Sequence, residues 1–309
     1  MEQNETNAEP MKNPEINTEK VTQGGSSSGC GCGCGCGGGG GKGSNKAVVA
    51  IWVVLLLGFA CVLAYTRSHG QNEAEKLLND AYALYEKQDF ASAADLLHQA
   101  AELGNPWAQI YYGGSLKQGS GVAADPAAAV EWYRKAAAQN VPVAYYELAV
   151  CYEYGQGVTP SLDEAAAWYQ KALDGGIGEA QGALWRVSVA KANDLFAHQR
   201  YREAVEILKK PAEEGYAEAQ ACYAACLMNA SGVNPDPLAA VEWYRKAAAQ
   251  NNPTAIYSLG VCYENGEGVD RNLDTALEWY HKAKNVGLED AQSAIIRVEK
   301  LKALKTAEQ

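Results

Sequence analysis

The chain has little of what catalysis and metal binding require. It has only four histidines, and no cysteine or carboxylate accompanies any of them at the spacing of a metal site. They are scattered along the chain: His69, His98, His198 and His281. The one Ser-x-x-Lys match, Ser188 to Lys191, lacks the Ser-Asp-Asn and Lys-Thr-Gly companions of β-lactam-acylated enzymes. We therefore predict a protein that is not an enzyme and that uses no cofactor.

Positive charge and a disulfide framework are also missing. Lys and Arg number 26 against 37 Asp and Glu, and the net charge of −11 lies in residues 71–309. An acidic domain repels phosphate backbones, so we expect no nucleic acid partner. Cys151 and Cys262 are equivalent positions 111 residues apart, and Cys222 and Cys226 lie one helical turn apart, so neither pair suits a disulfide. We expect all four to be small buried hydrophobic residues.

Residues 47–65 form one long run without charge, AVVAIWVVLLLGFACVLAY. As a helix this run is about 28 Å long, which matches the hydrocarbon core of a bilayer. We predict a single transmembrane helix, with Lys42 and Lys46 before it and Arg67 after it as interfacial anchors. A cleaved signal peptide would follow a shorter leader, and a lipoprotein signal ending at Cys61 would need smaller residues before it.

The orientation of this segment is weakly specified, because the basic residues near its two ends are equal in number. A short untranslocated N-terminal segment before a large exported domain is the usual arrangement of a signal anchor. We therefore expect the N-terminus to be cytoplasmic and the repeat domain to be extracytoplasmic.

Residues 1–46 are polar and rich in glycine, and we expect them to be disordered. Four cysteines alternate with glycine in the stretch GCGCGCGCGGGGG: Cys30, Cys32, Cys34 and Cys36. The simplest interpretation is a low-complexity linker. A flexible thiolate set for a soft metal such as Cu(I) or Zn(II) is an alternative, although zinc sites space their paired cysteines more widely. Acylation near the membrane is a third.

The remainder of the chain consists of repeats. The block AAVEWYRKAAAQN starts at Ala128 and again at Ala239, an offset of 111 residues, and each copy lies in a looser unit that recurs every 36 residues. Repeats of this length are typical of helical solenoids. Four units share the pattern: 108–143, 144–179, 219–254 and 255–290. Two shorter units without the Gly-x-Gly turn, 75–107 and 180–218, correspond at the same offset; residues 66–74 are a linker and residues 291–309 a capping helix.

Each of the four units predicts two helices joined by a glycine turn. The second glycine occurs in all four, which predicts that only this position needs positive φ or an unobstructed backbone: Gly121, Gly157, Gly232 and Gly268. N-cap residues follow four positions later: Asp125, Ser161, Asp236 and Asn272. Asn and Gly, which suit a left-handed C-terminal cap, end the second helix. This helix carries a Trp-Tyr pair whose tryptophan we expect in the core: Trp132, Trp168, Trp243 and Trp279.

The pattern AxxxLG/AxxxYxxGxGV…A…WYxKAAxxG resembles the Sel-one-like repeat, a variant of the tetratricopeptide repeat. The two shorter units look like ordinary tetratricopeptide repeats. The resemblance covers residues 75–291 and implies an all-α, right-handed α/α solenoid, preceded here by the disordered tail and one transmembrane helix. Proteins of this class act as adaptors that assemble complexes, often at membranes or in the bacterial envelope, although a fold alone does not determine a function.

In this architecture the first helices line the concave face. They carry tyrosines that would anchor a bound peptide if exposed: Tyr111, Tyr112, Tyr145, Tyr146 and Tyr257. Core packing is the alternative role for these rings. We hypothesise a membrane-anchored, non-enzymatic scaffold that binds a protein or peptide on the concave face. The alternative is a cell-envelope factor that binds polysaccharide or peptidoglycan in the same groove; a hydrolase is disfavoured by the missing catalytic constellation.

Overall fold

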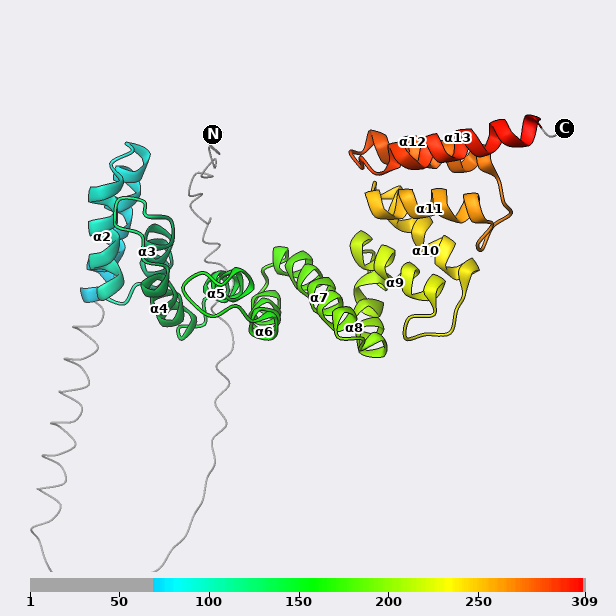
Figure 1. Cartoon of the computed structure of the whole chain (residues 1–309). Coiled ribbons are helices and arrows are strands. Elements are labelled where there is room, and N and C mark those ends of the chain that lie inside the picture. The colour runs from blue at the N-terminus through cyan, green and yellow to red at the C-terminus, as the bar shows by residue number, and fades with distance from the viewer. Residues whose placement is uncertain (1–68, 308–309) are drawn as a thin grey trace, which may run out of the picture. The chain divides into compact units, whose positions relative to one another are not determined.

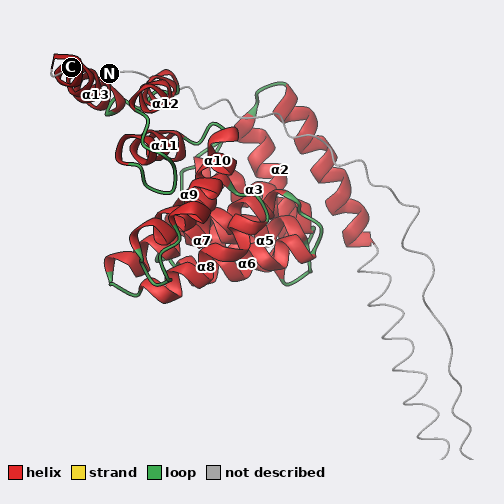
Figure 2. Cartoon of the chain, turned by 90° about the vertical axis from the view of Figure 1, so that its right-hand side faces the viewer, coloured by secondary structure: helices red, strands yellow, loops and turns green. Residues whose placement is uncertain are grey.

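The structure is a computed structural model, and it describes residues 69–307. All regular structure in these residues is helical, and Figure 2 shows no strand among them. The first helix covers residues 69–86. It is followed by α2 (Phe90–Glu102), α3 (Pro106–Gln118), α4 (Pro126–Ala137), α5 (Pro142–Tyr154), α6 (Leu162–Asp174), α7 (Glu179–Ala197), α8 (Tyr201–Glu213), α9 (Ala217–Asn229), α10 (Pro237–Ala249), α11 (Pro253–Asn265), α12 (Leu273–Asn285) and α13 (Ala291–Ala307).

Helices that are neighbours in the sequence pack on one another, and Figure 1 shows them following in chain order from cyan to red. Their buried side chains form several successive clusters, each shared by a few neighbouring helices. Small residues such as Ala144 and Ala255, both 0% exposed, allow the helices to approach closely. The predicted all-α solenoid of repeats is therefore confirmed for the described residues.

The predicted tail (1–46) and the predicted transmembrane helix (47–65) lie outside the described residues. Between residues 69 and 307, no helix has the length and apolar character needed to cross a bilayer.

The helix boundaries follow the predicted capping residues. The Asp125 carboxylate accepts a hydrogen bond from the Ala128 backbone N–H at 3.0 Å, and Asp236 accepts the equivalent bond from Ala239 at 3.0 Å. Ser161 and Asn272 cap α6 and α12 in the same way. The predicted C-terminal cap positions all have left-handed backbone: Asn140 (φ 60°), Gly176 (φ 95°), Asn251 (φ 61°) and Gly287 (φ 93°). Local chemistry thus sets both ends of each second helix.

The glycine turns differ from the prediction in one respect. The first turn position has positive φ as well, and in the third unit Ala230 adopts it with φ 56°. The second glycine differs because the backbone of the preceding unit lies against it. A Cβ on Gly157 would lie 2.1 Å from the Pro126 carbonyl oxygen, and one on Gly121 would lie 2.0 Å from that of Phe90. Close backbone approach therefore distinguishes the second position, whereas positive φ is common to both.

Residues 69–74, which we assigned to a linker, are helical. Ala74, Leu78 and Ala81 recur at helical spacing and are buried in one cluster with Leu97 of α2. This apolar face extends the helix toward the N-terminus, so the first unit begins earlier than predicted.

The predicted capping helix, α13, corresponds to α7 at the 111-residue offset. We call residues 69–179 the first block and residues 180–290 the second block. Arg186 of α7 donates two hydrogen bonds to Glu153, at 2.8 and 2.9 Å, and Arg297 of α13 donates two to Glu264, at 2.9 and 2.7 Å. Each of the two helices also forms an ion pair with the helix before it. Lys191 of α7 pairs with Asp163 of α6, and Lys302 of α13 pairs with Asp274 of α12. Thus α13 docks on the second block as α7 docks on the first.

Candidate functional site

The five tyrosines that we predicted as partner contacts are all half-buried. Each ring contacts at least one other aromatic ring of the solenoid. The ring pairs and centroid distances are Tyr111–Tyr82 (5.4 Å), Tyr112–Trp132 (5.6 Å), Tyr145–Trp168 (5.8 Å), Tyr146–Tyr169 (5.3 Å) and Tyr257–Tyr280 (5.2 Å). Each ring therefore contributes to packing and still keeps part of its surface accessible.

The tryptophans of the second helices lie at the edge of the core. Trp132 is 8% exposed, and Trp168, Trp243 and Trp279 are half-buried. The lysine three residues later lies over each indole ring, one helical turn away. The distances from Nζ to the ring centroid are 3.4 Å for Lys135, 3.9 Å for Lys171, 3.8 Å for Lys246 and 4.2 Å for Lys282. The repeated Trp-Tyr-x-Lys sequence thus builds a cation–π pair in each of the four longer units.

The sequence prediction missed Tyr223, which lies 111 residues after Tyr112. Its ring packs edge-on against Trp243 at 5.6 Å, as the Tyr112 ring packs against Trp132. Tyr223 is half-buried like the predicted five. Extending the duplication offset to each candidate residue would have found it.

A polar cluster joins consecutive units. The Tyr169 hydroxyl donates to Glu153 at 2.6 Å, and the Tyr280 hydroxyl donates to Glu264 at 2.7 Å. Hydrogen bonds from the Arg297 guanidinium and the Tyr280 hydroxyl lower the pKa of Glu264, although burial of this carboxyl acts in the opposite direction. Burial of Glu153 acts in the opposite direction, yet hydrogen bonds from Arg186 and Tyr169 outweigh it and lower that pKa too. Both carboxylates are therefore ionised structural links.

The residues that we considered for catalysis have other roles. Ser188 donates its hydroxyl hydrogen bond to the Leu184 carbonyl oxygen at 2.8 Å, and Lys191 pairs with Asp163 at 2.5 Å. Burial raises the pKa of three thiols to about 11, so the nucleophilic thiolate does not form at neutral pH: Cys151, Cys226 and Cys262. In residues 69–307, no group of three or more His, Cys, Asp or Glu side chains could hold a metal ion.

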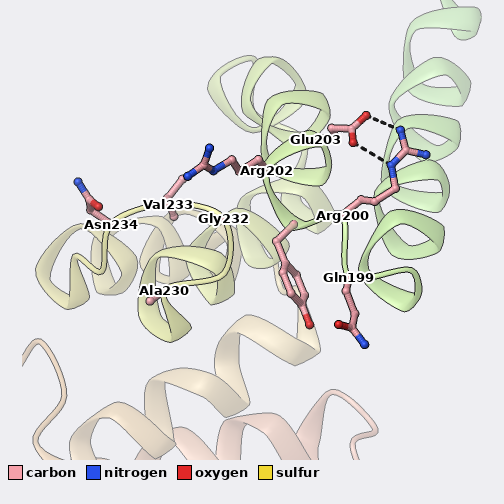
Figure 3. Close-up of a pocket in the computed structure, with 9 residues that line it drawn as sticks. Gln199, Arg200, Arg202, Glu203, Ala230, Gly232, Val233 and Asn234 are labelled. Atoms are coloured by element: carbon pink, nitrogen blue, oxygen red, sulfur yellow. Dashed lines mark hydrogen bonds and ion pairs between the residues drawn. The ribbon is translucent and has the colours of Figure 1, made fainter.

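One pocket, of about 770 Å³, lies between the start of α8 and the turn that joins α9 to α10 (Figure 3). Its lining includes Arg200, Arg202 and Glu203. Arg200 donates to both Glu203 oxygens, at 2.8 and 2.5 Å, so the charge of this carboxylate is already compensated. The turn between α9 and α10 contributes Ala230, Gly232, Val233 and Asn234 to the lining. Gln199 and Tyr201 complete the lining.

A second pocket, of about 440 Å³, lies between α10, α11 and α12 beside Trp279. The buried Ile256 contributes to its lining, and Val286 adds an apolar wall. The complete lining is Arg245, Ala248, Ala249, Asn251, Ile256, Trp279, Lys282, Asn285 and Val286. An apolar cavity with a few polar groups is the usual form of a binding site for a small group.

The family model described as Sel1 repeat matches five segments: residues 82–105, 108–141, 142–177, 217–252 and 253–288. Together they make up more than half of the chain. The first segment falls in the shorter unit at 75–107, and the four others follow the four units with the Gly-x-Gly pattern. None of the curated proteins matches the chain significantly.

Two solved structures are similar in fold. A Sel1 repeat protein from Oxalobacter formigenes is 27% identical with a TM-score of 0.52, over 70% of this chain and 88% of that chain. The protein c5321, a protective antigen present in uropathogenic Escherichia coli strains and displaying an SLR fold, is 32% identical with a TM-score of 0.51. That match covers 76% of this chain and 51% of the antigen, so the chain spans about half the antigen's length.

Proposed function

Because the chain belongs to the Sel1 repeat family, as its sequence pattern predicts, we propose that it is a membrane-anchored scaffold that binds a protein or peptide on the concave face. Sel1 repeat proteins generally mediate protein–protein interactions and are generally not enzymes. The binding surface consists of the tyrosines of the first helices. The anchor is the apolar run of residues 47–65.

The observation that carries the proposal is the common setting of these tyrosines. Each ring contacts at least one other aromatic ring and is only half-buried. A ring that is already fixed loses little conformational freedom when a partner covers it, which favours tight association. Tyrosine is also among the residue types that contribute most to binding at protein interfaces. Tyr223 extends the same arrangement into the second block.

Affinity capture with the full-length chain from detergent-solubilised membranes tests this function. We expect the double variant Tyr145→Ala/Tyr257→Ala to lose proteins that the unchanged chain retains. Leu238→Ala is the matched control, because Leu238 is a 71% exposed apolar residue on a second helix, α10. Loss of the same proteins by Leu238→Ala, or retention of all of them by the double variant, would contradict the proposal. Thermal unfolding of each variant establishes that the solenoid is intact.

The same proposal places the N-terminus in the cytoplasm and the repeat domain on the other side of the membrane. Protease added to intact cells or spheroplasts should then degrade the repeat domain without detergent. Protection until the membrane is permeabilised would reverse the orientation. A chain without residues 47–65 should leave the membrane fraction, and its continued sedimentation with membranes would contradict the anchor.

A further inference from the structure

The pocket beside Trp279 has a counterpart in the first block that is filled by the chain itself. At the 111-residue offset, Ile256 corresponds to Tyr145 and Trp279 to Trp168. The Tyr145 ring stacks on Trp168 with 5.8 Å between centroids and 30° between planes. Its hydroxyl donates a hydrogen bond to Oδ1 of Asn140 at 3.1 Å. In the first block, this position therefore carries a tyrosine whose ring is held by Trp168 and whose hydroxyl is held by Asn140.

The second block keeps the groups that hold the ring and lacks the ring. Trp279 remains, with Lys282 over it at 4.2 Å as Lys171 lies over Trp168 at 3.9 Å. Asn251 remains in the position of Asn140, with the same left-handed backbone (φ 60° and 61°). Ile256 is 3% exposed and lines the pocket at the position of the Tyr145 ring in the sequence alignment of the two blocks. Among residues 69–307 no aromatic ring stacks on Trp279, and no side chain bonds to the Asn251 amide.

The other two units fill the same position differently. Gln109 and Gln220 occupy it, and each donates from its side-chain amide to a carbonyl oxygen of the preceding helix, that of Ala101 at 3.2 Å and that of Ala212 at 3.1 Å. The cavity thus coincides with the one unit in which this position carries neither tyrosine nor glutamine. A second replacement, Val286 for Gly175, adds an apolar wall to the space.

We infer that the Trp279 pocket binds a tyrosine side chain presented by a partner protein. The incoming ring stacks on Trp279, and its hydroxyl bonds to the Asn251 side chain, as Tyr145 does with Trp168 and Asn140. The lining holds Lys282 and Arg245 and no carboxylate; Arg245 is paired with Glu242 at 2.6 Å, so Lys282 supplies the positive charge of the pocket. A segment with acidic residues beside its tyrosine therefore suits the pocket best. This inference rests on the proposed scaffold function and names the group that the partner supplies.

Two peptides test the inference on the full-length chain in nanodiscs. One carries a single tyrosine flanked by glutamate and serine, and the other has phenylalanine in its place; binding is followed by ligand-observed NMR titration. The variant Ile256→Tyr introduces the residue found at Tyr145 and should fill the pocket without disturbing the fold. We expect it to bind the tyrosine peptide about tenfold more weakly or worse, with an unchanged unfolding midpoint. Undiminished binding by this variant would overturn the inference.

Two further variants separate the contributions of ring and hydroxyl. Asn251→Gly keeps a residue that accepts positive φ and removes the amide, so it should abolish the preference for the tyrosine peptide over the phenylalanine peptide. Tyr145→Ile should open an equivalent pocket beside Trp168 and raise the binding stoichiometry from one peptide to two. An unchanged preference in the first variant, or a single site in the second, would contradict the proposed contacts.

The outcome is distinguishable from failure of the scaffold function. If Ile256→Tyr retains every captured protein that Tyr145→Ala/Tyr257→Ala loses, the scaffold function stands and the pocket assignment fails. If no protein is captured by the unchanged chain, the scaffold function fails whatever the peptides do. A concentration-dependent dimer that Ile256→Tyr abolishes would assign the pocket to a second copy of the chain and overturn the partner proposed here.

Discussion

The two blocks share the contacts that hold helices together and differ in what their first helices present. Gln139 donates to the Gly104 carbonyl oxygen at 3.1 Å, and Gln250 donates to that of Gly215 at 2.9 Å. Other links between helices recur in the same way: Arg134–Tyr152 with Arg245–Tyr263, and Tyr169–Glu153 with Tyr280–Glu264. The first helices differ at several positions, where Tyr111, Lys117 and Tyr145 correspond to Cys222, Met228 and Ile256. The two blocks therefore share these links between helices, while some side chains on their first helices differ.

Replacing the second glycine of the turn should have the largest effect on the stability of the fold. Gly121→Ala and Gly232→Ala should each destabilise the fold by about 3 kcal/mol or more, because positive φ and a backbone clash act together. A Cβ on Gly232 would lie 2.5 Å from the Tyr201 carbonyl carbon. Gly119→Ala, at the position where the second block already has Ala230, should cost about 1 kcal/mol because the new Cβ is placed in a left-handed backbone. Chemical denaturation measures all three, and equal costs at Gly119 and Gly121 would contradict the difference between the two positions.

Removing the hydroxyl of the buried tyrosine in each polar cluster should have the next largest effect on the free energy of unfolding. Tyr169→Phe and Tyr280→Phe each remove a donor to an ionised carboxylate, so each should cost about 1.5 kcal/mol. Both rings are 0% exposed, and the donor–acceptor distances differ by only 0.1 Å (2.6 against 2.7 Å), so the two costs should be equal. Denaturation of the two single variants measures this. A cost at only one site would show that the blocks do not share this link.

Acid should weaken both clusters together. The folded chain holds the pKa of Glu153 and Glu264 below their ordinary value of 4.5, so the unfolded chain takes up protons first as the pH falls. The stabilisation is therefore complete above about pH 4.5 and is lost as the pH drops through the lower, folded-state pKa values. Thermal unfolding across this range should show a smaller pH dependence in Glu264→Gln than in the unchanged chain. The same slope in both would exclude Glu264 as a contributor.

Replacing the lysines that lie over the indole rings should have the smallest effect on the stability of the fold. Lys135→Met and Lys246→Met keep most of the aliphatic contact and remove the charge over Trp132 and Trp243. Each should cost about 0.5 kcal/mol, the usual size of an exposed cation–π contact. Denaturation followed by tryptophan fluorescence measures both. A cost above about 2 kcal/mol at either site would assign the lysine a larger role than this contact.

The sequence predicted the helices well because their ends depend on local chemistry. Asp125, Ser161, Asp236 and Asn272 bond within three residues of themselves, and such contacts are visible in a one-dimensional pattern. The close backbone approach at the glycine turns was not predicted as the distinguishing feature. It depends on where the preceding unit lies, and Ala230 shows that positive φ alone does not require glycine here.

The candidate site was less predictable than the fold. The pairs Arg186–Glu153 and Arg297–Glu264 each join residues 33 positions apart, so no short motif contains them. Tyrosine content indicated aromatic contacts on the first helices, yet the degree of burial of each ring depends on the neighbouring unit. The pocket beside Trp279 results from the absence of a ring at Ile256. Such an absence is noticed only when the two blocks are compared residue by residue in three dimensions.

The match between α7 and α13 has a consequence for how such a protein can lengthen. Since α13 engages Glu264 with the same guanidinium fork that α7 uses on Glu153, a further copy of residues 180–290 inserted between the second block and α13 would find compatible junctions at both of its ends. One unequal recombination event within the gene would then suffice to enlarge the array by a whole module. Each added module would bring its own aromatic surface, free to acquire a different specificity.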